Sequence, residues 1–77
     1  GASAYEIIRA VKQEQMPKVR LNTRGANGRI YWLVNGEQKA QTMAGEVFEY
    51  RFPFKGSYDL TALDEQGRFD RIQIKVE

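Results

Sequence analysis

Apolar and polar residues alternate along most of this 77-residue chain. In the stretch "IQIKV" at 72–76, for example, every second residue is apolar and the residues between are polar or charged. A period of two is typical of β-strands that bury one face and expose the other. The pattern therefore predicts strands over residues 19–23, 30–34, 48–52, 58–62 and 72–76.

Turn signals separate these segments about every nine residues, a spacing that indicates short antiparallel strands rather than helices. Asn35-Gly36 is the strongest signal, because both residues tolerate the positive φ that a two-residue type I′ hairpin requires. Asp64–Gly67 suits a type I turn closed by a left-handed glycine. The other predicted turns are Ala26-Asn27-Gly28, Ala44-Gly45 and Lys55-Gly56.

The stretch at residues 5–10 admits two interpretations. The first is a helix that starts at a capping-box spacing, with an apolar face formed by Ala4, Ile7, Ile8 and Val11. The same stretch fits an edge strand with Ile8 turned inward, and we prefer the strand. The polar residues 12–17 are predicted to form a loop.

The length of the chain predicts a single domain over residues 4–77. Gly1-Ala2-Ser3 is interpreted as a cloning remnant, and the domain as a part excised from a larger protein. Twelve basic and ten acidic residues give a net charge of +2, too small to indicate a nucleic acid or an anionic membrane as partner. No apolar run approaches the roughly 20 residues needed to span a bilayer, so we expect no direct membrane insertion.

The residue types present argue against several chemistries. The chain has no Cys and no His, which excludes disulfides, Ser-His and Cys-His arrangements, and an ordinary zinc site. Asp64, Glu65 and Asp70 flank the last predicted hairpin, but this turn is too short to supply the six to eight oxygens that Ca²⁺ prefers. A turn role is therefore preferred for Asp64. We expect no catalytic, metal or cofactor site.

Six or seven short strands predict an all-β fold, specifically an immunoglobulin-like antiparallel β-sandwich of about seven strands. Trp32 lies mid-strand between inward-facing Ile30 and Val34, so we expect it in the core rather than as a platform for sugar rings. In "GSYDLTALD" at 56–64, Tyr58 is predicted to form a tyrosine corner, with its hydroxyl bonded back to the preceding turn. Gly36 and Gly67 are assigned turn roles.

The order of "IYWLVNGE" and "KGSYDLTALDEQGRFDRIQIKV" resembles the C-terminal domain family of penicillin-binding protein 1C, a bifunctional peptidoglycan synthase. The resemblance covers about residues 19–76. It is carried by Tyr31-Trp32-Leu33, Asn35-Gly36, Gly56, Tyr58, Leu60, Asp64, Gly67 and Arg68.

This resemblance implies a non-catalytic accessory domain at the C-terminus of a cell-wall synthase. In the family, glycosyl transfer and transpeptidation belong to earlier domains. The implied location is the periplasm, as part of a protein anchored in the inner membrane.

The alternation also predicts a surface. If Trp32 faces inward, Tyr31 and Leu33 face outward, beside the strands at 58–63 and 72–76 that we expect to pair with this one. An exposed Tyr and two Leu rimmed by charge suit a modest protein-docking patch. The candidate docking face comprises Tyr31, Leu33, Leu63, Arg71 and Lys75. The resemblance offers as partner the adjoining transpeptidase domain or another cell-wall synthesis protein.

Two alternatives remain open at the level of sequence. The domain could bind peptidoglycan glycans or peptides directly, or it could be an adhesion or nucleic-acid-binding β-module. A basic set could track an anionic polymer, namely Arg20, Arg24, Arg29 and Arg51. A docking domain should show an apolar outer sheet face, whereas a glycan binder should show a groove with an exposed aromatic ring.

Overall fold

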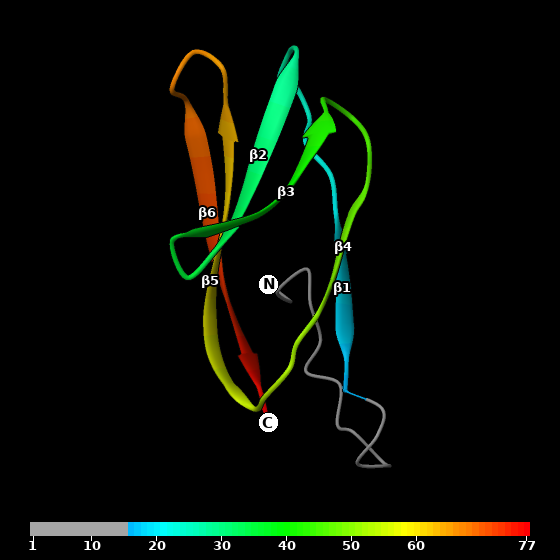
Figure 1. The fold of residues 1–77 in the computed structure, drawn as a ribbon, viewed down its shortest axis with the longest axis vertical. Helices are drawn as coiled ribbons and strands as arrows, with labels where there is room; N and C mark the ends of the chain where they lie inside the picture. The colour runs from blue at the N-terminus through cyan, green and yellow to red at the C-terminus, as the bar shows by residue number, and fades with distance from the viewer. Residues whose placement is uncertain (1–15) are drawn as a thin grey trace.

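The computed structural model describes residues 16–77, which form six β-strands and no helix (Figure 1). The strands are β1 (Lys18–Leu21), β2 (Arg29–Val34), β3 (Glu37–Met43), β4 (Phe48–Arg51), β5 (Gly56–Asp64) and β6 (Phe69–Val76). The predicted all-β class is confirmed. The strand predicted over residues 5–10 lies outside the described residues.

The strands form two antiparallel sheets arranged as a sandwich. One sheet has the order β3-β2-β5-β6, and the other contains β1 and β4. β2 therefore lies between β3 and β5, and β6 pairs with β5 alone among the described strands. The expectation that β2 pairs directly with the 72–76 strand was wrong, because β5 lies between the two.

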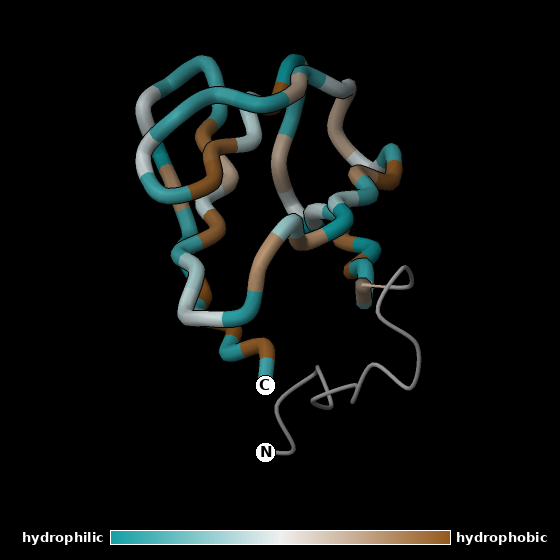
Figure 2. The backbone as a smooth tube through the Cα atoms, turned by 60° about the horizontal axis from the view of Figure 1, so that its bottom comes forward, coloured by the Kyte–Doolittle hydropathy of each residue, from teal (hydrophilic) through white to brown (hydrophobic). Residues whose placement is uncertain are grey.

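Apolar side chains from both sheets form two adjoining core clusters. In the first, Val19 of β1 and Phe52, which directly follows β4, pack against residues of β2, β5 and β6, such as Leu60 of β5. In the second, Phe48 of β4 covers Ile30 and Trp32 of β2. This packing follows from the sequence pattern, because apolar and polar residues alternate along the chain, as the colours of the tube in Figure 2 show.

Trp32 lies in the core, with 3% of its surface exposed. Its ring stacks on Phe48 at a centroid distance of 5.0 Å and an interplanar angle of 14°. The indole N–H donates a hydrogen bond of 2.9 Å to the hydroxyl oxygen of Thr42 on β3. This bond satisfies the one polar group that burial of an indole removes from water.

The hairpin between β2 and β3 has the predicted turn chemistry. Asn35 has a φ of 52° and Gly36 a φ of 83°, as a type I′ turn requires. Asn35 also joins the turn to β5, because its N–H donates to the Asp59 carbonyl at 2.8 Å and its Oδ1 accepts the Asp59 N–H at 2.9 Å.

Tyr58 closes the corner between β4 and β5. Its hydroxyl donates to the carbonyl oxygen of Phe54 and accepts the Phe54 N–H at 3.1 Å. The ring packs inside, tilted against Phe52 at a centroid distance of 4.7 Å. The corner residue therefore contributes both core packing and the hydrogen bonds that hold the preceding loop.

Candidate functional site

The outer face of the four-stranded sheet carries a continuous apolar row. Tyr31 on β2 lies directly opposite Leu63 on β5, and Leu63 lies directly opposite Phe69 on β6. Directly opposed residues of antiparallel strands project from the same face, so these three side chains adjoin one another. Leu33 lies beside the row, opposite Thr61. We call Tyr31, Leu33, Leu63 and Phe69 the outer-face cluster.

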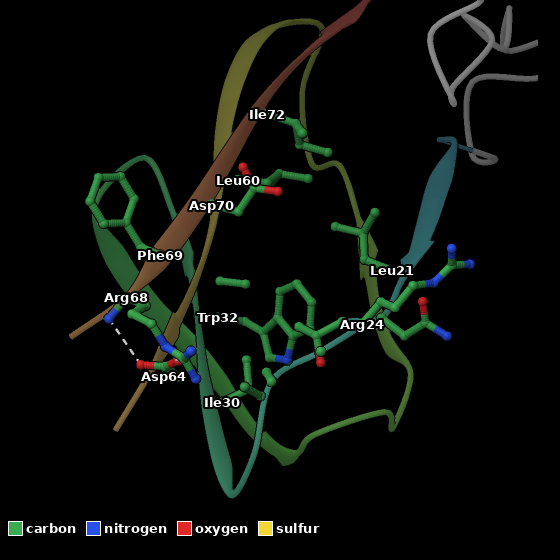
Figure 3. Close-up of a pocket in the computed structure, with 15 residues that line it drawn as sticks. Leu21, Arg24, Ile30, Trp32, Leu60, Asp64, Arg68, Phe69, Asp70 and Ile72 are labelled. Atoms are coloured by element: carbon green, nitrogen blue, oxygen red, sulfur yellow. Dashed lines mark hydrogen bonds and ion pairs between the residues drawn. The ribbon is translucent and has the colours of Figure 1, made fainter. Parts of the chain in front are cut away.

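The sequence reasoning missed Phe69, which is the most exposed member of this cluster. It is 64% exposed, whereas the other three residues are half-buried. Figure 3 shows its ring on the side of β6 away from the space between the sheets. The signal was available in the period-two pattern, because Phe69 shares its face of β6 with Arg71 and Lys75.

The two predicted cations stand at different distances from the cluster. Arg71 lies opposite Thr61, next to Leu63, and so borders the cluster directly. Lys75 lies opposite Ser57, about 13 Å further along β6 at strand rise, and its ammonium group lies 3.8 Å from Glu77. The structure therefore places Arg71 beside the outer-face cluster, and it places Lys75 on the same sheet face but away from the cluster.

The three carboxylates near the last hairpin make different hydrogen bonds. Asp64, whose side chain is 6% exposed, accepts hydrogen bonds from the N–H groups of Gln66 and Arg68, both at 2.9 Å, and from Arg68 Nε at 2.8 Å. Glu65 accepts the Arg29 N–H at 3.3 Å, and Asp70 accepts that of Arg71 at 3.0 Å. No group of three or more potential metal-ligating side chains occurs within residues 16–77.

The environment of Asp64 acts on its pKa in two directions. Burial raises the pKa of this carboxyl, but the hydrogen bonds from Arg68 and Gln66 and the Arg68 charge together bring it below its ordinary value. Asp64 therefore stays ionised as a turn anchor, which is unsuited to general acid catalysis near neutral pH.

The basic residues do not gather on one surface. Arg20 pairs with Glu49 at 3.0 Å on the two-stranded sheet, and Arg51 of the same sheet donates to the Met16 carbonyl. Arg29 belongs to the other sheet, and Arg24 lies in the loop after β1. Within the described residues, these four arginines therefore do not form one basic track for an anionic polymer.

A cleft of about 560 Å³ opens between the two sheets. Leu21, Trp32, Leu60 and Ile72 are among the side chains that line it (Figure 3). Trp32 stands at its floor with only 3% of its surface exposed, so it does not present an open ring for a sugar to stack on. Polar residues such as Asn22 and Asp70 stand among the lining residues as well.

These features define a small all-β module with an apolar row on the outer face of its four-stranded sheet. The model of the penicillin-binding protein C-terminus family matches residues 4–75, and the chain therefore belongs to this family. The family resemblance expected from the strand and turn motifs is confirmed. Neither the curated proteins nor the solved structures yielded a match. Among residues 16–77, no helix has the length and apolarity needed to cross a membrane.

Proposed function

We propose that this chain is a non-catalytic accessory domain at the C-terminus of a bacterial cell-wall synthase, and that it docks onto a protein through the outer-face cluster. Membership of the penicillin-binding protein C-terminus family supports the setting. The apolar row of Tyr31, Leu63 and Phe69 is the observation that carries the docking role, because an aromatic side chain 64% exposed beside two half-buried neighbours suits the centre of an interface.

The partner that we propose is the transpeptidase domain of the same synthase, on the periplasmic side of the inner membrane. A patch of four side chains is small against the roughly 800 Å² per partner of a stable free complex. Covalent attachment relaxes this requirement, because a tethered partner has an effective concentration on the order of millimolar. Arg71 at the border of the cluster favours a partner surface with an apolar centre and an acidic rim.

An NMR titration tests this proposal. The ¹⁵N-labelled domain is mixed with the isolated transpeptidase domain of a penicillin-binding protein, and chemical-shift changes are expected at Tyr31, Leu33, Leu63 and Phe69. Phe69→Ala should weaken binding by about tenfold or more, as expected for an aromatic anchor worth roughly 1.4 kcal/mol or above.

Phe54→Ala is the matched control. Phe54 is also a largely exposed phenylalanine, at 73%, but it lies at the corner before β5 and away from the cluster. The control variant should bind like the wild type. Equal effects of the two substitutions would contradict docking through this face.

Two further arms separate the alternatives. Shifts produced by soluble peptidoglycan fragments, centred on the cleft rather than on the outer face, would instead identify a wall-binding module. A binding constant that falls steeply with salt would point to charge-driven binding of a polyanion, whereas an apolar dock should change little between 50 and 200 mM salt.

A further inference from the structure

β6 forms one margin of the four-stranded sheet, because it pairs with β5 alone among the described strands (Figure 1). Its sequence, "FDRIQIKV", contains no Pro and no Gly, and it pairs with β5 in one unbroken register. A regular strand rich in β-branched residues at a sheet margin is a template for pairing with another chain. The free edge of β6 is therefore a place where two copies of this chain could join.

Two hydrogen-bond patterns identify the backbone groups of β6 that point to this free edge. Asp64 N–H donates to the Arg68 carbonyl at 2.9 Å, and bonded and non-bonded pairs alternate from there along the antiparallel ladder. Asp59 and Gln73 form a non-bonded pair, since both backbone groups of Asp59 bond to Asn35 on the other side of β5. The residues whose N–H and C=O groups point away from β5 are therefore Phe69, Arg71, Gln73 and Lys75.

One N–H group in the middle of this edge already has a partner. Arg71 N–H donates to Oδ1 of Asp70 at 3.0 Å. Asp70 shares the inner face of β6 with Ile72, and both residues line the cleft between the sheets. The Asp70 carboxylate therefore lies where the carbonyl oxygen of an added strand would accept the Arg71 N–H. A carbonyl brought to this position would lose that hydrogen bond and would face a negative charge.

β3, at the opposite margin of the sheet, has different protection. It carries polar residues on both faces, and its pairing with β2 is interrupted by a register shift between Trp32 and Leu33. Charged side chains and irregular pairing both discourage the addition of a strand. β6 is regular along Phe69–Val76 and has an apolar inner face beyond Asp70, so the Asp70 carboxylate is the feature that distinguishes its edge.

The cations on the outer face of β6 do not by themselves prevent two copies from pairing. Antiparallel β6 strands about a two-fold axis at Ile72 would bring their outward-directed backbone groups together. The pairs across the axis would be Arg71 with Gln73 and Phe69 with Lys75. No cation would then lie directly opposite another cation, so the positive side chains leave this register open.

We propose that Asp70 disfavours this register and thereby keeps the free edge of β6 from pairing with β6 of a second copy. In the paired state Asp70 would lie opposite Ile74 of the second copy, on the inner face. Its carboxylate would lose the Arg71 N–H and would be taken from water beside an aliphatic side chain, which is unfavourable for a charged group. The two-fold symmetry would impose this loss twice in each dimer.

Sedimentation analysis of Asp70→Val tests this role on the full 77-residue chain. The wild type is expected to stay monomeric up to about 1 mM, whereas the variant should dimerise with a Kd of about 0.1 mM or lower. Asp59→Val is the matched control, because it removes the same charge from β5, which has a paired strand on each side. The control should stay monomeric, and equal dimerisation of the two variants would overturn the proposal.

Asp70→Asn is a second, milder variant, which keeps the size of the side chain and removes its charge. It should also dimerise, but more weakly than Asp70→Val, because its amide oxygen can still accept the Arg71 N–H. Monomeric behaviour of both variants at about 1 mM, with a folded circular-dichroism spectrum, would contradict a role for Asp70 at this edge.

Amide hydrogen exchange locates the contact. In Asp70→Val, protection of the Arg71 and Gln73 N–H groups should rise with protein concentration between about 20 µM and about 1 mM. Dimerisation without that protection would mean that another surface pairs. In the dilute wild type, the Gln73 N–H should exchange much faster than the Ile72 N–H, which bonds to β5. Equal protection of these two groups would mean that the edge is already covered, and either result would refute the proposal.

Discussion

The hydrogen bond between Trp32 and Thr42 predicts a specific pattern of stability losses. The indole N–H is buried with Trp32 and has the hydroxyl of Thr42 as its partner at 2.9 Å. Thr42→Val keeps the shape of the residue but removes the acceptor, while Trp32→Phe removes the donor and retains an aromatic ring against Phe48. The two substitutions and their combination form a double-mutant cycle.

The magnitudes follow from what each variant leaves behind. Thr42→Val leaves a buried N–H without its acceptor, which costs about 1–3 kcal/mol. Trp32→Phe keeps part of the stacking but opens a cavity, and should cost about 1–3 kcal/mol, below the 3–5 kcal/mol of a full truncation to alanine. Once the donor is absent, replacing the acceptor costs little, so the double variant should be more stable than the sum predicts by about 1 kcal/mol.

The mild substitutions matter because the domain has little stability to lose. At about 0.05–0.15 kcal/mol per residue, a chain of this length has a free energy of unfolding of roughly 4–12 kcal/mol. Trp32→Ala, expected to cost about 3–5 kcal/mol, can unfold such a domain outright. If the Trp32→Ala variant had the same melting temperature as the wild type, the assignment of Trp32 to the core would be refuted.

Urea unfolding followed by circular dichroism measures the cycle, since fluorescence is lost in the Trp32 variants. Thr61→Val is the control: Thr61 is a half-buried strand threonine on the outer face of β5, and it should shift stability by less than about 0.5 kcal/mol. Losses that add without coupling, or a Thr42→Val cost no larger than that of Thr61→Val, would refute the reasoning.

Three further predictions concern the turns and the corner. Tyr58→Phe should cost about 1–2 kcal/mol in urea unfolding, because both polar groups of Phe54 lose the tyrosine hydroxyl; a neutral effect would contradict the corner. Asp64→Asn should be destabilising at pH 6 and much less so at pH 2. Because the pKa of Asp64 is lowered in the folded state, its contribution to stability is present above its ordinary pKa and is lost as the pH falls through the folded-state pKa. A stability difference between the Asp64→Asn variant and the wild type that did not change with pH would refute this prediction. Gly36→Ala should cost about 1–2 kcal/mol, since its φ is 83° although its surroundings are open; an unchanged Tm would exclude the type I′ turn.

The sequence was sufficient for the parts of the fold in which pattern and burial agree. In β2 the alternation gave the inward direction of Trp32, and Asn35-Gly36 gave the hairpin that follows. β3 was not among the strands predicted from alternation, because "EQKAQTM" has polar residues on both faces. It is an edge strand held by β2 rather than by its own apolar pattern, and strand propensity depends strongly on such context.

The candidate site was only partly predictable, for a related reason. Tyr31, Leu33 and Leu63 could be assigned to one face by parity alone, but their adjacency depends on the register, which places Tyr31 opposite Leu63. Register also places Phe69 next to Leu63, and it places Lys75 on the same face but about 13 Å along β6 from Arg71. Period-two reasoning gives the face of a side chain, whereas the neighbour across the strand is decided by pairing.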